Sequence, residues 1–425
     1  MADQTIIDTA THWPGHTIRR QVVINATTAY IFYYGTLGGQ LKIQYKKTTD
    51  AGLTWGAAVA LSSTGNFHGI DLYYARWTSA AAANVAYIGF AETYDGKLYY
   101  MKFNFDTDTL DVTQTEVVDL TGTFVETLSI VYARNGDLFM TGRTRAGAAL
   151  NWTGRSQDDG ATWSAVANLT EGPSDQILLW PDFSGATDDI LGIFWDLSAN
   201  AVTVKQLDTS ADNITETAIA SSVQGWGDGQ SDPANWGMTL NSSGVLYLAL
   251  ADAWTNPPTS VNVTTYTVNG ASVTAKTNVL TTTGYVSAPY LSIDPTGRVR
   301  CFYGIDPENA SRESQVYAYK SSDDDMATWS AQTIQSDAPA GQYWITSGIG
   351  DPLPKGIILP TWFDETTNYF NALAISLAAL VGSLGFTFTL GGTLTGVTSA
   401  APPIVIKCKP LVAGDIVNFS VRTRG

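Results

Sequence analysis

The chain has little cysteine, histidine and positive charge, and each shortage excludes a class of protein. Two cysteines, Cys301 and Cys408, in 425 residues are too few for a disulfide framework. The three histidines, His12, His16 and His68, have no spacing that is typical of a zinc site. Lys and Arg number 23 against 39 Asp and Glu, and a net charge of −16 argues against binding nucleic acid or anionic membranes. We therefore predict no metal, no cofactor and no nucleic-acid partner.

The sequence also lacks a signal peptide and a clear membrane span. Residues 1–4 provide neither a basic segment nor an apolar core, so no standard secretion signal is expected. Residues 372–390 are uncharged and almost long enough to cross a bilayer. However, Ser and Thr residues interrupt this stretch, and residues 386–390 alternate as a β-strand does. We predict no membrane insertion.

A repeated eight-residue pattern is the strongest positive signal. It reads Ser/Thr-x-Asp-x-Gly-x-Thr-Trp at residues 48–55 and 156–163, and again at 322–329 with Met326 in place of glycine. The Asp side chain can accept hydrogen bonds from its own turn, and Gly allows a positive φ. The acidic run 323–325 could alternatively bind a metal ion, although acidic turns are usually solvated. The pattern predicts tight turns between strands.

This pattern resembles the Asp box, or BNR repeat, of sialidases and related β-propellers. The resemblance implies an all-β propeller of four-stranded blades, in which each box joins the third strand to the fourth. The residues assigned to the boxes are Asp50, Gly52, Trp55, Asp158, Gly160, Trp163, Asp324 and Trp329.

The spacing of the turns sets the size of a blade. Asp50 and Asp158 are 108 positions apart, and Asp158 and Asp324 are 166 apart, which correspond to two and three units. Seven apolar, β-branched or aromatic strands recur, one in each unit. We therefore favour seven blades over the six of sialidases, with residues 5–8 supplying the missing fourth strand of the last blade. The expected second strands are 29–34, 85–91, 137–143, 190–196, 245–251, 298–304 and 356–363.

Two regions are expected. Residues 1–376 should form the propeller, and residues 377–425 a short C-terminal β-extension. Residues 366–406 carry no charge, so the extension is also a candidate surface for assembly, docking or homo-oligomerisation.

The propeller resemblance places ligands on the face opposite the boxes. Loops expected on that face contain tryptophans, which can stack on sugar rings, and carboxylates, which accept hydroxyl hydrogen bonds. Alternatively, the tryptophans pack between blades and the acids are solvated loop ends. The candidate ligand-binding residues are Trp226, Asp228, Trp236, Asp252, Trp254, Asp306, Arg312 and Trp344.

Two enzyme classes are considered. A sialidase needs an arginine triad, and the stretch around Arg19 and Arg20 lacks the proline of the usual Arg-Ile-Pro motif. Some related seven-bladed propellers are polysaccharide lyases, which need a base and a cation. If the chain is such an enzyme, His68 is the candidate base and Arg76 the candidate cation, although a structural role for His68 is the simpler interpretation.

The leading functional hypothesis is therefore non-catalytic. It is an interaction protein, a tail, fibre or decoration component of a bacteriophage virion, whose propeller face binds a surface glycan or other virion proteins. Its location would be the virion or an extracellular surface. The alternative is a glycan-cleaving enzyme, either a sialidase-like glycoside hydrolase or a polysaccharide lyase.

Overall fold

The structure is a computed structural model, and it describes part of the chain. The described residues are 4–7, 19–63, 65, 67–92, 96–120, 125–144, 151–166, 176–184, 188–196, 201–221, 236–241, 243–251, 261–283, 286–294, 296–305, 316–334, 343–344, 357–358, 361–364, 369–372 and 375–376.

The described strands form seven successive antiparallel sheets, which we number as blades. Blade 1 contains β2 (Gln21–Val23), β3 (Ala29–Leu37), β4 (Gln40–Thr48) and β5 (Val59–Ala60). Blade 2 contains β6 (Phe67–Tyr74), β7 (Val85–Glu92), β8 (Lys97–Asn104) and β9 (Thr109–Asp119). Blade 3 contains β10 (Val125–Tyr132), β11 (Leu138–Thr144), β12 (Asn151–Ser156) and β13 (Ser164–Ala165). Blade 4 contains β14 (Gln176–Pro181), β15 (Ile190–Asp196), β16 (Ala201–Asp208) and β17 (Asn213–Ser221).

The remaining three blades complete the ring. Blade 5 contains β18 (Trp236–Leu240), β19 (Leu246–Ala251), β20 (Val261–Asn269), β21 (Ser272–Ala275) and β22 (Leu280–Thr282). Blade 6 contains β23 (Val286–Ile293), β24 (Val299–Ile305), β25 (Val316–Ser322) and β26 (Thr333–Ile334). Blade 7 contains β27 (Tyr343–Trp344), β29 (Thr361–Asp364), β30 (Tyr369–Ala372) and β1 (Gln4–Ile7). A separate pair joins β28 (Ile357–Ile358) to β31 (Ile375–Ser376), and α1 (Ala75–Thr78) follows β6.

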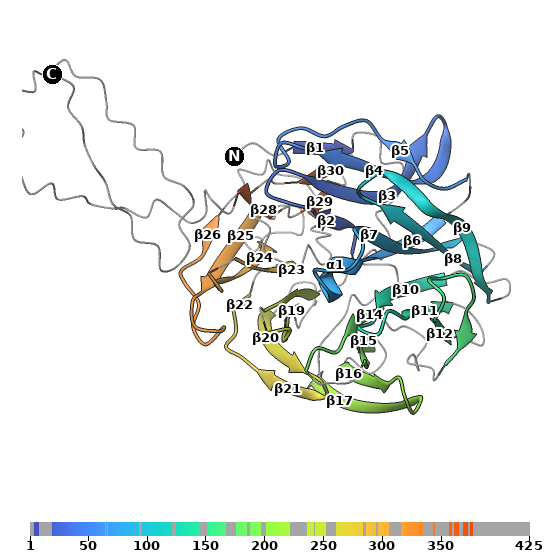
Figure 1. The fold of residues 1–425 in the computed structure, drawn as a ribbon. Helices are drawn as coiled ribbons and strands as arrows, with labels where there is room; N and C mark the ends of the chain where they lie inside the picture. Colours follow the sequence, from blue (N-terminus) through green and yellow to red (C-terminus); the bar gives the residue numbers. More distant parts are fainter. Residues whose placement is uncertain are drawn as a thin grey trace, which may run out of the picture. The chain divides into compact units, whose positions relative to one another are not determined.

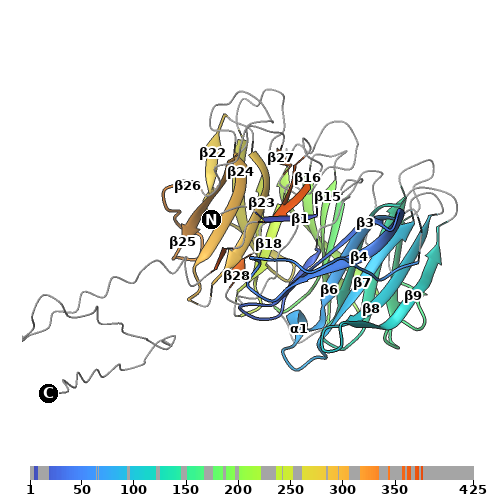
Figure 2. The same cartoon turned by 90° about the horizontal axis from the view of Figure 1, so that it is seen from above.

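These sheets follow one another around a common centre as the blades of a β-propeller (Figure 1). Figure 2 shows the same ring turned by 90°. The predicted all-β propeller of four-stranded blades is confirmed. Six sheets have four strands, and blade 5 has five because β21 and β22 both pair with the same edge of β20. The fifth sheet is thus a four-stranded blade whose outer strand is interrupted, which fits the seven blades that the sequence favours.

The N-terminal strand closes the ring. β1 pairs antiparallel with β30, with Thr5 opposite Asn371, and forms the outer strand of blade 7. This confirms the prediction that an N-terminal segment supplies the missing fourth strand. Asp8, the last residue of that predicted strand, lies outside the described residues.

Burial explains why the second strands are the clearest in the sequence. β3, β7, β11, β19 and β24 are buried at nearly every position, because both of their faces contact neighbouring blades. They therefore read as continuous apolar runs rather than as alternating ones. The third strand β8 alternates, and the short outer strands β5, β13 and β26 are exposed. The core lies toward the centre of the ring.

The three repeated turns have one hydrogen-bond arrangement, and each joins a third strand to a fourth. In the first, Thr54 N and Oγ1 donate to the two carboxylate oxygens of Asp50 at 2.9 and 2.6 Å. Asp158 and Asp324 accept the same pair of bonds from Thr162 and Thr328. These bonds hold the pKa of each aspartate below its usual range, and bring the pKa of Asp324 to about 2.

The chain divides into two units, Met1–Gly382 and Ser383–Gly425. The predicted β-extension, residues 377–425, lies outside the described residues, so its structure and its role in assembly stay predictions. In the part of the chain that the structure describes, no helix is both long and apolar enough to span a membrane.

Candidate functional site

The strand order gives the ring two distinct faces. One face of the ring is called the upper face. At this face the first strand of each blade begins, the second strand ends and the third strand begins. In blade 3, for example, Val125 at the start of β10 pairs with Thr144 at the end of β11. The three Asp turns lie at the opposite, lower face, since they follow third strands. Blade connections and second-to-third loops therefore share the upper face, as the resemblance implied.

His68 lies at the upper end of β6, the inner strand of blade 2. Its backbone pairs with Ala91, and the register shifts between His68 and Ile70. Gly69, at this irregularity, has a φ of +74°. Bulges of this kind are common beside active sites. The sequence-predicted base is thus at the beginning of a strand rather than in the preceding loop.

Arg76 lies at the other end of the same strand. It belongs to α1, which follows the lower end of β6, and its Nε donates to the Ala82 carbonyl oxygen at 3.2 Å. β6 continues for six residues beyond His68, so about 20 Å of strand separate the two positions. The structure does not bring His68 and Arg76 into one site.

Two of the eight predicted ligand-binding residues have a described backbone. Trp236 is the first residue of β18, opposite Leu250, and Trp344 is in β27, opposite Phe363. Both positions are at upper ends of first strands, as His68 is. Six of the predicted residues lie outside the described residues, namely Trp226, Asp228, Asp252, Trp254, Asp306 and Arg312.

A tyrosine–glutamate pair at the upper end of blade 2 is absent from the sequence-based candidates. Tyr99 of β8 donates its hydroxyl to Glu92 Oε2 of β7 at 2.9 Å, and both side chains are partly exposed. The Tyr99 ring stacks on Phe90 with centroids 5.3 Å apart. Strand alternation places both residues on one face of the sheet once the register across the short loop at 93–96 is known.

A buried ion pair lies against the inner strands of blades 2, 3 and 4. Arg19, which precedes β2, is fully buried, and its Nε donates to Asp71 Oδ1 at 2.9 Å. Arg19 Nη1 also donates to the Leu179 carbonyl oxygen at 3.0 Å. Ser129 Oγ donates to Asp71 Oδ2 at 2.8 Å and accepts from Leu179 N at 2.9 Å. One arginine thus links the inner strands of blades 2, 3 and 4, and a pair so fully bonded tolerates its burial.

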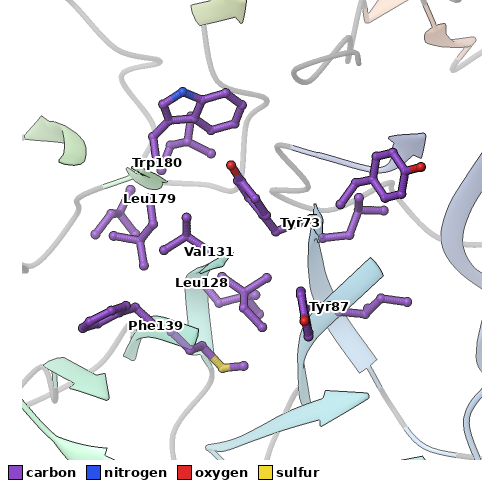
Figure 3. Close-up of a cluster of buried hydrophobic side chains, with 14 of the residues drawn as sticks. Tyr73, Tyr87, Leu128, Val131, Phe139, Leu179 and Trp180 are labelled. Carbon is purple, nitrogen blue, oxygen red and sulfur yellow. The ribbon is translucent and has the colours of Figure 1, made fainter. Parts of the chain in front are cut away.

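Aromatic rings surround this ion pair. The Arg19 guanidinium lies 5.1 Å from the Tyr73 ring centroid and 5.5 Å from that of Trp180. Tyr73 and Trp180 are 5.6 Å apart, and Figure 3 shows them beside Leu179 and Val131. Asp71 is three residues beyond His68 along β6, or about 10 Å. Aromatic side chains therefore fill the space around this ion pair at the inner strands of blades 2 and 4.

The acidic run of the third turn is divided among three separate partners. Asp323 pairs with Arg298, Asp324 accepts from Ser322 and Thr328, and Asp325 pairs with Lys276. Among the described residues, no group of three or more His, Cys, Asp or Glu side chains is arranged to hold a metal ion. Each of these carboxylates has a local structural role.

Comparison with known proteins identifies the architecture. No family model matches the chain, and no curated protein matches its sequence. An ulvan lyase of a new polysaccharide lyase family is similar in structure, with a TM-score of 0.58, 11% identity and coverage of 88% of this chain and 96% of that chain. Its complex with -[GlcA(1-4)Rha3S]- also gives a TM-score of 0.58, with 12% identity and the same coverage. A Hadza microbial sialidase has a TM-score of 0.47 and 12% identity, with coverage of 89% of this chain and 69% of that chain.

These comparisons correct the functional interpretation. The similarity to the ulvan lyase extends over 88% of this chain and agrees with the fold implied by the repeated turn. The interpretation as a non-catalytic virion component is wrong, because the similar solved structures are glycan-active enzymes. At 11–12% identity the similarity itself establishes the fold.

Proposed function

We propose that this protein cleaves a uronate-containing polysaccharide by β-elimination, with His68 as the base. The observation that carries the proposal is the place of His68, at the upper end of an inner strand and on a bulge next to Gly69. The similarity of fold to an ulvan lyase over 88% of the chain supports the reaction class. The two predicted ligand-binding residues with a described backbone, Trp236 and Trp344, are at the same face.

The reaction requires few groups. A neutral imidazole removes the proton at C5 of the uronate, and the electron pair of that C–H bond forms the C4=C5 double bond. The glycosidic C4–O bond breaks, and its oxygen leaves and takes a proton from water. A base positioned in this way contributes a factor of about 10² to 10⁴ in rate.

A cation must stabilise the carboxylate while charge develops beside it. Arg76 does not serve, because it lies at the lower end of β6. The predicted ligand-binding residue Arg312 lies outside the described residues.

A sialidase-like reaction has weaker support. Arg19 lies in the stretch that was compared with the sialidase Arg-Ile-Pro motif. It is fully buried and hydrogen-bonded to Asp71 and Leu179. Its guanidinium therefore binds protein groups inside the ring rather than a substrate carboxylate.

The test is cleavage of a panel of uronate-containing polymers, followed by the ultraviolet absorbance of the new double bond. The panel contains ulvan, desulfated ulvan, alginate and polygalacturonate. We expect the wild-type protein to form unsaturated products from at least one polymer, and His68→Ala to lower kcat by about 10² to 10⁴.

Arg76→Ala is the matched control, because it changes the opposite end of the same strand and should leave the rate unchanged. No unsaturated product from any polymer, or full activity of His68→Ala, would contradict the proposal.

A further inference from the structure

Two turns of the ring contain an asparagine followed by a glycine, and their surroundings differ. Asn135-Gly136 lies between β10 and β11 of blade 3, and Asn269-Gly270 lies at the turn between β20 and β21 of blade 5. Both asparagine side chains are exposed. An asparagine before glycine loses its side-chain amide readily, because glycine has no side chain to hinder attack by its own backbone nitrogen. The fold decides which of the two sites can react.

Hydrogen bonds restrain the reacting groups at Asn135. Its Nδ2 donates to Asp137 Oδ2 at 2.9 Å, and its Oδ1 accepts from Asp137 N at 3.0 Å. The attacking nitrogen, Gly136 N, donates to the Ala133 carbonyl oxygen at 3.1 Å. Asp137 is buried and paired with Arg155, so its carboxylate is itself fixed. Deprotonation of Gly136 N and rotation of the carboxamide therefore require these bonds to break.

Asn269 has none of these restraints. It is the last residue of β20 and is opposite Ser272 across a two-residue turn. In the part of the chain that the structure describes, neither the Asn269 carboxamide nor the Gly270 amide takes part in a hydrogen bond. Gly270 has a φ of +60°, in the left-handed region that favours glycine. Both reacting groups are thus free to approach each other.

The reaction is an intramolecular substitution followed by hydrolysis. Gly270 N loses its proton to solvent and attacks the carboxamide carbon of Asn269. The bond between that carbon and the side-chain nitrogen breaks, and ammonia leaves with a proton from water. Water then opens the five-membered imide at one of its two carbonyl groups. One opening gives aspartate, the other gives isoaspartate, and both products carry a new carboxylate.

A new carboxylate at this turn is unfavourable, because the turn lies against blade 4. A Cβ on Gly270 would lie 2.7 Å from Ser184 Oγ and 3.4 Å from Asp182 Oδ2. Asp182 is buried and accepts hydrogen bonds from Ser184 and Gln206. Its described partners include no lysine or arginine. Deamidation therefore adds a charge of the same sign close to a buried carboxylate.

The turn of blade 5 also lacks a contact that secures other turns of the ring. In blades 2 and 6 the turn between the third and fourth strands carries Asp108 or Asp325, which pairs with a lysine of the preceding blade. In blade 5, Gly270 has no side chain that could pair with blade 4. Isoaspartate adds a methylene group to the backbone and would disturb the pairing of β20 with β21.

We propose that Asn269-Gly270 is a site of spontaneous deamidation, and that its products loosen the contact between blades 4 and 5. The site reacts in the folded protein, whereas the fold protects Asn135. This inference does not depend on the proposed function.

Peptide mapping of the full-length protein after incubation in mildly alkaline buffer tests the site. We expect aspartate and isoaspartate to accumulate at position 269 at least about 10-fold faster than at position 135, because breaking one hydrogen bond slows a reaction by up to about 10-fold. In denaturant the two sites should react at similar rates, since the bonds around Asn135 are then lost. An intact Asn269, or equal rates at the two sites in the folded protein, would overturn the proposal.

Asn269→Gln tests the effect on the blades. Glutamine keeps an exposed amide but closes the larger, six-membered imide much more slowly. After the same incubation, the thermal unfolding midpoint of the wild type should fall, whereas that of Asn269→Gln should stay at its starting value. Asn135→Gln is the matched control, and its midpoint should fall during incubation as the wild type's does. If incubated wild type and incubated Asn269→Gln lose the same stability, deamidation does not loosen the blades and the proposal is wrong.

Discussion

At the scale of single residues, Met326 shows a conflict between backbone and side chain. It occupies the glycine position of the third turn, with a φ of +64°, and its amide donates to Ser322 Oγ at 2.9 Å as Gly52 and Gly160 do in theirs. A non-glycine residue in the left-handed region costs about 1–2 kcal/mol. The Met326 side chain is nevertheless fully buried in the cluster that spans blades 5 and 6. Burial of the side chain offsets the strain.

Met326→Gly should therefore destabilise the protein, although it restores the repeated pattern. Loss of a buried methionine side chain costs about 2–5 kcal/mol, which exceeds the strain relieved. We expect the free energy of unfolding, measured by denaturant titration, to fall by about 1–3 kcal/mol. The control is Ala51→Gly, at a φ of 61° in the first turn, where little side chain is lost and the change should be near zero or slightly stabilising. A gain of stability in Met326→Gly would mean that the strain dominates.

At the scale of elements, lower-face turns are clamped to the preceding blade. The clamp is an aspartate with positive φ that accepts bonds from a lysine and a tyrosine of the blade before it. Asp108 accepts from Lys47 Nζ at 2.7 Å and from Tyr30. Asp325 accepts from Lys276 Nζ at 2.6 Å and from Tyr247, whose pKa is raised to about 12 by burial and by this bond. Tyr247 therefore stays a donor at any ordinary pH.

The two halves of a clamp should differ in their contribution. Tyr247 is buried, so Tyr247→Phe removes a buried donor from a carboxylate and should cost about 1–3 kcal/mol of unfolding free energy. Lys276→Met removes a partly exposed ion pair and should cost about 0.2–1 kcal/mol, an effect that high salt abolishes. Denaturant titrations at low and high salt measure both. Lys97→Met, which breaks the ion pair within blade 2, is the control for a pair that joins no blades. Equal costs for the two clamp variants would refute the role of burial.

These elements also show what the sequence could predict. The sequence predicts the second strands because burial on both faces gives continuous apolar runs. It predicts the turns because Asp, Gly and Thr have fixed positions in them. The clamps cannot be predicted from the sequence, because Tyr30 and Asp108 are 78 residues apart and come into contact only when the blades pack. The predicted pairing of His68 with Arg76 neglected that β6 lies between them. The Tyr99–Glu92 pair needs the register of two strands, which the sequence leaves open.

At the scale of the whole molecule, closure depends on residues from opposite ends of the chain. β1 pairs with β30, so residues 4–7 complete a sheet formed by residues 343–372. The outer strands of the other blades follow their third strands directly in sequence. Blade 7 alone among the described blades needs a non-local strand, and without it β30 would expose an edge that can pair with another molecule.

Thr5→Pro should therefore open the ring, because Thr5 is paired with Asn371 and precedes the β-bulge at Ile6. Proline removes a backbone N–H donor and is tolerated poorly within a paired strand. We expect a loss of about 1–3 kcal/mol in unfolding free energy and concentration-dependent association through the exposed edge of β30. Thermal unfolding and light scattering over a range of protein concentrations measure the two effects. Ile334→Pro is the matched control in the outer strand β26 of blade 6, which its turn keeps close to β25. It should lower stability less and cause no association, because loss of two outer residues leaves the ring closed. If both variants behave alike, the N-terminal strand is an ordinary edge rather than the closure of the propeller.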